Sequence, residues 1–266
     1  MNVNDPRWAS IDAFVEENRD NILRDITRLV AVPSVEGAPE PGAPFGPGPK
    51  AALAKALEIA DELGLDTFNA DSYIGWAETG KIADGQKFLA TITHTDVVPE
   101  GNGWDADPYT VRVRDGWLLG RGVADDKGPS ILCLYALKYL KDSGAALKYP
   151  VRALLGANEE TNMHDVDYYA EHYPMPAFCF TPDAEFPVCN GEKGGFNGEI
   201  VSPKLDGIQL SFVQFFVVSV LSTIFAFVFE APSPDQFRAA AVSIAYCGIM
   251  SSGVAYTLQI VGQKAL

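Results

Sequence analysis

Short apolar runs that suit β-strands alternate with helical runs, and this order constrains the fold more than any other feature. The strand-like runs cover residues 88–93, 110–113, 117–119, 151–157 and 177–180, and the helical runs among them cover 129–140 and 165–172. Residues 114–116, Arg-Asp-Gly, supply a hairpin turn between two of the strands. Strands separated by helices predict an α/β layered domain with a largely parallel sheet.

Two helices are predicted ahead of these strands. Apolar residues from Ile11 to Val30 form one stripe, which indicates an amphipathic helix, and a second helix is expected over residues 51–63 with Gly64 as its stop. Residues 37–49, between them, are rich in glycine and proline and predict a loop, with a linker between domains as the alternative.

Histidine and acidic residues follow the predicted strands at four places. These residues are His94 and Asp96, Asp125 and Asp126, Glu159 and Glu160, and Asp183. Ligands of open α/β sheets gather at the carboxyl ends of the strands, where several loops meet. A set of nitrogen and oxygen donors without cysteine suits zinc, manganese or cobalt.

Each of these clusters also has a plain structural interpretation. Asp125 and Asp126 precede a predicted helix and could cap it, and Asp183 follows a proline and could form a turn. Glu159 and Glu160 could lie in a solvated loop. Brought together, however, so many carboxylates would repel one another unless a cation neutralised them.

The charge of the chain excludes several partners. The net charge is −15, and the five charged residues beyond residue 204 sum to only −1, so nearly all of it falls on the first 204 residues. A field of this sign disfavours nucleic acid and anionic membrane surfaces. The four cysteines show no metal-type spacing and residues 1–21 are too polar for a secretory signal, which predicts a cytoplasmic location for this part.

The last part of the chain differs in composition. Residues 207–229 and 239–263 contain no charged side chain, and each run is long enough for a bilayer core of about 30 Å. We therefore predict two domains, 1–203 and 204–266, the second a two-helix hairpin that anchors the chain in the inner membrane through residues 207–263. The alternative is a pair of buried helices in a soluble protein.

Five motifs resemble a known family. They are THTDVVP at residues 93–99, GRGVADDKGP at 120–129, NEE at 158–160, TPDAEFPV at 181–188 and GEKG at 191–194. Together they resemble the aminoacylase and carnosinase-like zinc metallopeptidases, in the branch of the bacterial dipeptidases, from about residue 11 to residue 201. The resemblance implies a three-layer, aminopeptidase-like α/β fold and hydrolysis of dipeptides or small N-acyl amino acids. A homodimer is one assembly that the sequence leaves open.

The resemblance also implies roles for single residues. Asp125 matches a carboxylate that bridges two zinc ions, with manganese or cobalt as alternatives. His94 and Asp183 would complete the ligands of one ion, and Glu160 would bind the other. Glu159 matches the general base.

The remaining role falls to Asp96, which matches the carboxylate that orients the metal-binding histidine.

The sequence departs from this family in one respect. The family takes a further histidine ligand from far downstream, after an inserted lid domain, whereas this sequence has only His94, His164 and His172. The last two fall on a predicted outward-facing helix. We therefore expect an incomplete catalytic domain with impaired hydrolysis, and whether the isolated chain is an enzyme stays open.

The tail has a resemblance of its own. Residues 248–264, GIMSSGVAYTLQIVGQK, are similar to a helix of the drug/metabolite transporter superfamily of EamA type. The alternative function is thus a membrane fragment of a small-molecule exporter that carries a non-catalytic, metal-binding passenger domain.

Overall fold

The computed structural model describes residues 6–184, 207–229, 233–246 and 248. The chain divides into two units, Met1–Asn190 and Gly191–Leu266. The predicted boundary near residue 203 and the GEKG motif lie outside the described residues.

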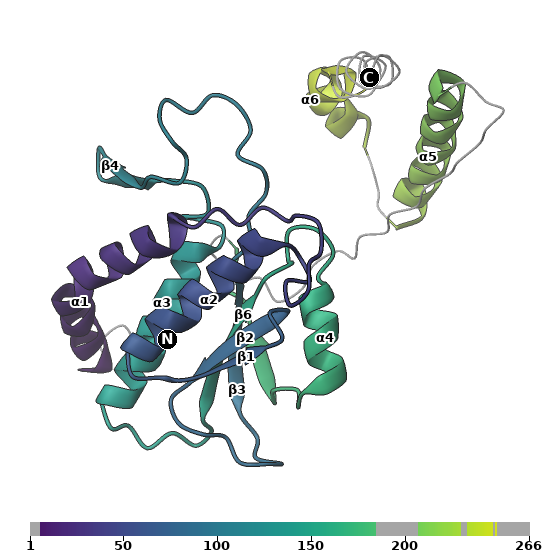
Figure 1. The fold of residues 1–266 in the computed structure, drawn as a ribbon. Coiled ribbons are helices and arrows are strands. Elements are labelled where there is room, and N and C mark those ends of the chain that lie inside the picture. The colour runs from purple at the N-terminus through teal and green to yellow at the C-terminus, as the bar shows by residue number, and fades with distance from the viewer. Residues whose placement is uncertain (1–5, 185–206, 230–232, 247, 249–266) are drawn as a thin grey trace. The chain divides into compact units, whose positions relative to one another are not determined.

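The first unit is built on a five-stranded sheet with the strand order β1-β2-β6-β3-β7 (Figure 1). The strands are β1 (Asp66–Ala70), β2 (Ile74–Glu78), β3 (Leu89–His94), β6 (Val151–Gly156) and β7 (Phe178–Phe180). Strands β3, β6 and β7 are parallel, whereas β1 and β2 pair with each other, and β2 with β6, in antiparallel register. The carboxyl ends of β3, β6 and β7 therefore meet at one edge of the sheet.

Helices cover both faces of this sheet (Figure 1). The helices α1 (Pro6–Val30), α2 (Pro47–Glu62) and α3 (Lys127–Asp142) share one hydrophobic core with Ala153 and Leu155 of β6. On the other face, Leu154 packs in a second core with Tyr169 of α4 (His164–His172). Successive side chains of a strand point to opposite faces, so β6 is buried on both sides. The predicted three-layer arrangement is confirmed.

The prediction of a largely parallel sheet is wrong, because β1 and β2 add an antiparallel hairpin that the strand pattern did not reveal. Four of the five residues of β1 are exposed, so the strand lacks a continuous apolar run. Its turn contains Asp71 and Ser72 with positive φ, at 53° and 62°, and the Asn69 side chain accepts a hydrogen bond from the Ser72 N–H at 2.8 Å. The sheet is mixed.

The other predicted elements of this unit are present with shifts of a few residues at their ends. The hairpin consists of β4 (Arg112–Arg114) and β5 (Trp117–Leu119), with Asp115 and Gly116 at positive φ in its turn. Gly64 follows α2 with a φ of 77°, as expected of a residue that ends a helix.

The second unit contains α5 (Gly207–Phe229) and α6 (Pro234–Ala245). Helix α6 starts earlier than the predicted run at residue 239, because the side chains of Ser233 and Gln236 cap it reciprocally. It therefore includes Asp235 and Arg238, 3.5 Å apart.

Counting only residues that are described, no helix combines the length and the apolar character of a membrane span. The predicted hairpin thus finds no support, and most of its second run lies outside the described residues.

Candidate metal centre

The predicted ligands come from four segments that meet at the carboxyl edge of the parallel strands. His94 is the last residue of β3, and Glu159 and Glu160 lie in the loop that follows β6. Asp183 follows β7, and Asp125 lies just before α3. Parallel pairing of the three strands brings these segments together although they are up to about 90 residues apart in sequence.

His94 is at the centre of the group, with only 2% of its surface exposed. Its Nε2 atom lies 3.0 Å from Asp125 Oδ1, 3.3 Å from Asp183 Oδ2 and 3.7 Å from Glu159 Oε2. One imidazole nitrogen therefore faces three carboxylates that belong to three different segments.

Asp96 holds the other side of the ring and the neighbouring loop. The Nδ1 atom of His94 is 3.1 Å from the Asp96 carbonyl oxygen and 3.3 Å from Asp96 Oδ1. The same carboxylate accepts the backbone N–H groups of Glu159 at 3.3 Å and Glu160 at 3.1 Å. This geometry agrees with the orienting role that the resemblance implies, and it adds a second one, the attachment of the loop that carries the two glutamates.

The backbone of His94 is held by the start of α3. Asp126 Oδ2 accepts the His94 N–H at 3.1 Å, and the Ser130 hydroxyl donates to the His94 carbonyl at 3.1 Å. Strand β7 pairs with β3 only over Leu89–Thr91, so the helix provides the partners that a longer strand would supply. Asp126 occupies the N-cap position of α3, as the structural alternative allowed, but its side chain makes no capping hydrogen bond.

Burial and mutual repulsion shift the pKa values of this group. Burial, with the charge of Asp183 next, raises the pKa of Asp126 to about 8. Burial also raises the pKa of Glu159, Glu160 and Asp183, each helped by a neighbouring carboxylate. Burial lowers the pKa of His94, but the hydrogen bond and charge of Asp96 outweigh it and raise the pKa to about 10.

Raised pKa values of both the carboxylates and the imidazole indicate a site with more negative than positive charge.

The donor atoms fit a divalent cation. Among the described residues, two groups have donor atoms within 4.8 Å of one another, and His94 belongs to both: one adds Glu159 and Asp183, and the other adds Asp125 and Glu160. A cation there would relieve the repulsion that raises the carboxylate pKa values. An imidazole with carboxylate oxygens is a common donor set for zinc.

All six predicted site residues thus lie together, but the grouping differs in detail from the implied roles. The donor atom of Asp125 groups with that of Glu160 and not with that of Asp183. The donor atom of Glu159, the implied general base, groups with that of Asp183. The roles of single residues stay predictions. His164 and His172 are exposed on α4, as expected, and neither belongs to these two groups.

Sequence reasoning missed the residues that hold the ligands in place. Ser130 lies inside a helix and carries no sequence signal of this role, and Asp165 belongs, by sequence alone, only to a predicted helix. The sequence shows Asp126 as one of an acidic pair, but it does not reveal that the side chain accepts a hydrogen bond from the His94 backbone.

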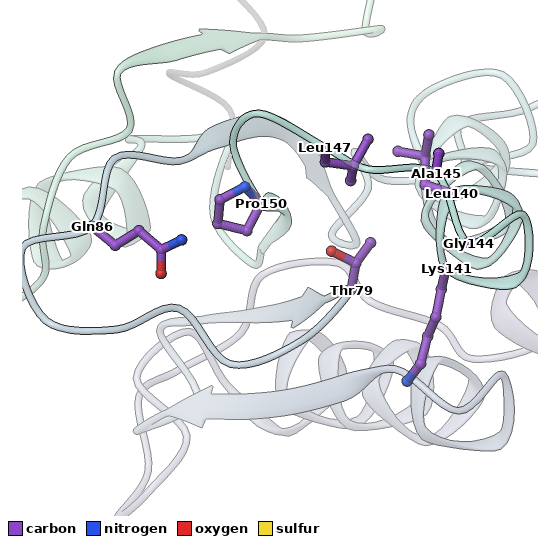
Figure 2. Close-up of a pocket in the computed structure, with 8 residues that line it drawn as sticks. All are labelled: Thr79, Gln86, Leu140, Lys141, Gly144, Ala145, Leu147 and Pro150. Atoms are coloured by element: carbon purple, nitrogen blue, oxygen red, sulfur yellow. The ribbon is translucent and has the colours of Figure 1, made fainter.

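The structure also contains a shallow pocket, whose lining residues are drawn in Figure 2. It has a volume of about 350 Å³, and Gln86 and Pro150, which line it, precede β3 and β6. It is therefore at the opposite edge of the sheet. Lys141 is its one charged lining residue, and its ammonium group donates to the Gly64 carbonyl.

The fold and the site together define an α/β protein with a candidate divalent-metal centre at the carboxyl edge of its sheet. Comparisons with known proteins narrow this class. The family model described as "Peptidase family M20/M25/M40" matches residues 90–259. The chain therefore belongs to this peptidase family.

Individual relatives agree with that assignment. The Beta-Ala-Xaa dipeptidase of Lactobacillus delbrueckii subsp. lactis is 43% identical over 190 residues, 70% of this chain and 40% of the relative. The Bacillus subtilis (strain 168) protein YtjP is 37% identical over 191 residues, 71% of this chain and 41% of the relative. The chain thus spans about two fifths of the length of these relatives.

A solved structure shows the same fold. Human carnosine dipeptidase 1 aligns with a TM-score of 0.54 and 20% identity, over 65% of this chain and 40% of the human chain. These comparisons give no support to the transporter resemblance of the tail, and the family match itself runs on to residue 259.

Proposed function

We propose that the first unit binds divalent metal ions and hydrolyses the amide bond of dipeptides. The observation that carries the proposal is the convergence on His94 Nε2 of carboxylates from three segments, at 3.0 to 3.7 Å. Membership of a peptidase family and the relative named Beta-Ala-Xaa dipeptidase support the substrate class. Small N-acyl amino acids, which also present an amide beside a carboxylate, are the second substrate class.

Two zinc ions are the proposed cofactors, with manganese or cobalt as alternatives. His94, Asp125 and Asp183 would hold one ion, and Asp125 with Glu160 would hold the other. When bound, such ions polarise the amide carbonyl and lower the pKa of a water molecule. The mixed nitrogen and oxygen donors favour these metals over calcium or magnesium, which prefer oxygen ligands alone.

Glu159 is the proposed general base. Its carboxylate lies 3.7 Å from His94 Nε2 and is 40% exposed, so a substrate can reach it. Burial and the charge of Asp183 raise the pKa of Glu159, which makes it a better proton acceptor. It would hold the proton taken from water and pass it to the leaving amine. Asp96 would keep the His94 ring and the Glu159 backbone in place.

Hydrolysis by these 266 residues is proposed to be slow. The two groups of donors share a single imidazole, because His94 belongs to both and the other two histidines are exposed on α4. A position with only carboxylate donors should bind zinc more weakly than one that includes an imidazole. Poor positioning of one ion then lowers the rate, since correct placement of reacting groups is worth roughly 7–11 kcal/mol.

A hydrolysis assay with zinc and a panel of dipeptides tests this function. We expect metal-dependent cleavage well below the median enzyme turnover of about 10 per second. The Glu159→Gln variant should lose the remaining activity while it still binds zinc. Cleavage that persists after metal removal, or in Glu159→Gln, would contradict the proposal. Zinc binding without any cleavage would favour a non-catalytic metal-binding protein.

The cytoplasmic location of this unit is also a proposal. Cys133 and Cys179 are both free thiols, as expected in a reducing compartment. Cys189 and Cys247 lie outside the described residues.

A further inference from the structure

We infer that Asp165 is a positioning residue, whose carboxylate fixes the loop that presents Glu159 and Glu160. The inference rests on the proposed function for the roles of these two glutamates. It assigns the geometry of their loop to a residue that lies outside the two groups of metal donors.

The Asp165 carboxylate binds the start of this loop directly. Its Oδ2 atom accepts the N–H groups of Ala157 at 2.8 Å and Asn158 at 3.0 Å, and its Oδ1 atom accepts the Val166 N–H at 2.8 Å. The side chain is completely buried. Burial raises the pKa of Asp165, and the three hydrogen bonds only partly oppose that shift.

The last residue of β6 is shaped for this contact. A Cβ atom at Gly156 would overlap Asp165 Oδ2, so only glycine lets the carboxylate come this close to the strand end. Gly156 and Asp165, which lie on either side of the loop, therefore serve one contact.

The loop is closed on itself between these anchors. The Asn158 side chain accepts the His164 N–H at 3.3 Å and donates to the Thr161 hydroxyl at 2.6 Å. The Met163 N–H donates to the Asn158 carbonyl at 2.9 Å. Asp165 thus holds one end of the loop at the sheet, and Asp96 holds Glu159 and Glu160 at the metal centre.

A simpler role for Asp165 is stabilisation of α4, because an acid in the first turn interacts favourably with the helix dipole. Asp167 provides the matched control, since it lies in the same first turn. Its side chain is 73% exposed and faces only His164, at 3.5 Å, among its described ion pairs. A substitution there removes a first-turn acid without touching the loop.

Hydrogen exchange of the full, metal-free chain tests the inference. In Asp165→Ala, the amides of Ala157 and Asn158 should exchange roughly tenfold faster or more, as expected when buried donors lose their acceptor. Asp165→Asn should be intermediate, because its one carbonyl oxygen can still accept both amides. Asp167→Ala should match the wild type. Unchanged exchange in Asp165→Ala, or equal acceleration throughout β2 and β6, would overturn the inference.

Zinc titration of the same variants tests the consequence for the site. Asp165→Ala and Gly156→Ala should each weaken zinc binding on the order of tenfold, as lost support around a metal site usually does. The double variant should be little worse than either single variant, because both act on one contact. Full additivity would overturn the inference. A wild-type chain that binds no zinc would contradict the proposed function, and the metal-free exchange experiment would still decide the role of Asp165.

Discussion

At the scale of residues, the acidic side chains of the candidate centre do two different jobs. Asp125, Glu160 and Asp183 present oxygens toward the shared donor space around His94. Asp96 and Asp126 instead accept backbone N–H groups of neighbouring segments. The sequence motifs contain carboxylates of both roles. The sequence alone does not distinguish them, because the role depends on the hydrogen-bond partners in the folded chain.

Asp96→Asn is expected to weaken zinc binding by about 10- to 100-fold, the usual cost of losing a carboxylate that orients a metal-binding histidine. The amide has a single acceptor oxygen where Asp96 now serves His94 and two backbone N–H groups. Asp115→Asn in the exposed β4–β5 turn is the control for the change of charge. Titration calorimetry measures the effect, and equal affinities of the two variants would contradict this role.

A second prediction concerns Asp25, which joins α1 to α3. Its buried carboxylate accepts the Tyr135 hydroxyl at 2.7 Å and lies 3.0 Å from Arg24 and 3.1 Å from Arg28. Burial raises the pKa of Asp25, but the hydrogen bonds from Arg24, Tyr135 and Arg28 outweigh it and hold the pKa below its usual range. The folded chain therefore binds fewer protons than the unfolded chain.

It follows that Asp25 stabilises the fold above about pH 4, its unfolded pKa, and that this stabilisation disappears as the pH falls through the folded-state value. Asp25→Asn should lower the free energy of unfolding by about 2 kcal/mol at pH 7, the cost of weakened buried hydrogen bonds. The difference from wild type should shrink below pH 4 in denaturant titrations. A difference that stays constant with pH would argue against this explanation, and Asp12→Asn, at an exposed position of α1, is the control for the change of charge.

The meeting of the candidate ligands could be predicted from sequence, because each follows a predicted strand in a specific motif. Their supports could not, because Asp126, Ser130 and Asp165 act through backbone groups that are brought near only by folding. The two groups into which the donor atoms fall were also beyond the sequence, since they depend on the separation of side chains from four segments.

At the scale of elements, β2 and β6 are joined by a buried ion pair. Glu78 and Arg152 face each other in the antiparallel register, and Arg152 Nε donates to Glu78 Oε1 at 2.8 Å. The guanidinium lies 4.4 Å from the Trp76 ring and 4.5 Å from the Phe88 ring, and it donates to the Tyr169 hydroxyl at 2.7 Å. This network ties the antiparallel hairpin to the parallel part of the sheet.

Glu78→Ala should destabilise the chain by roughly 3–5 kcal/mol, because it leaves the Arg152 charge buried without its partner. Replacing both residues, in Glu78→Leu with Arg152→Met, should recover most of that loss. Lys138→Ala, which removes one member of an exposed pair with Asp142, is the control and should change little. Chemical denaturation gives the comparison. A double variant as unstable as Glu78→Ala would contradict the explanation.

The elements that the sequence predicted well are helices with a periodic apolar stripe and strands with a short apolar run. Helix α3 carries a buried stripe, and β3 and β6 are short apolar runs buried on both faces. Strand β1 was missed because most of its side chains are exposed, and β2 because it contains a glycine against which Leu53 and Leu57 of α2 pack closely. Without this hairpin the sheet looked parallel.

At the scale of the whole molecule, the composition of the last part of the chain was the least reliable basis for predicting its structure. Charge-free runs predicted a membrane hairpin, but a run of residues does not fix where a helix begins. The caps at Ser233 and Gln236 start α6 among charged residues. The peptidase family model matches the chain up to residue 259, so it covers most of residues 248–264, which were expected to resemble a transporter helix.

The central claim, that His94 and its carboxylates form a divalent-metal centre, is tested most directly by calorimetric titration of the 266-residue chain with zinc chloride. The account predicts one tightly bound ion and a second, weaker one. His94→Ala should abolish the tight site, whereas His172→Ala, a change at an exposed histidine of α4, should leave it intact. Absence of zinc binding, or binding that His94→Ala leaves unchanged, would contradict the account.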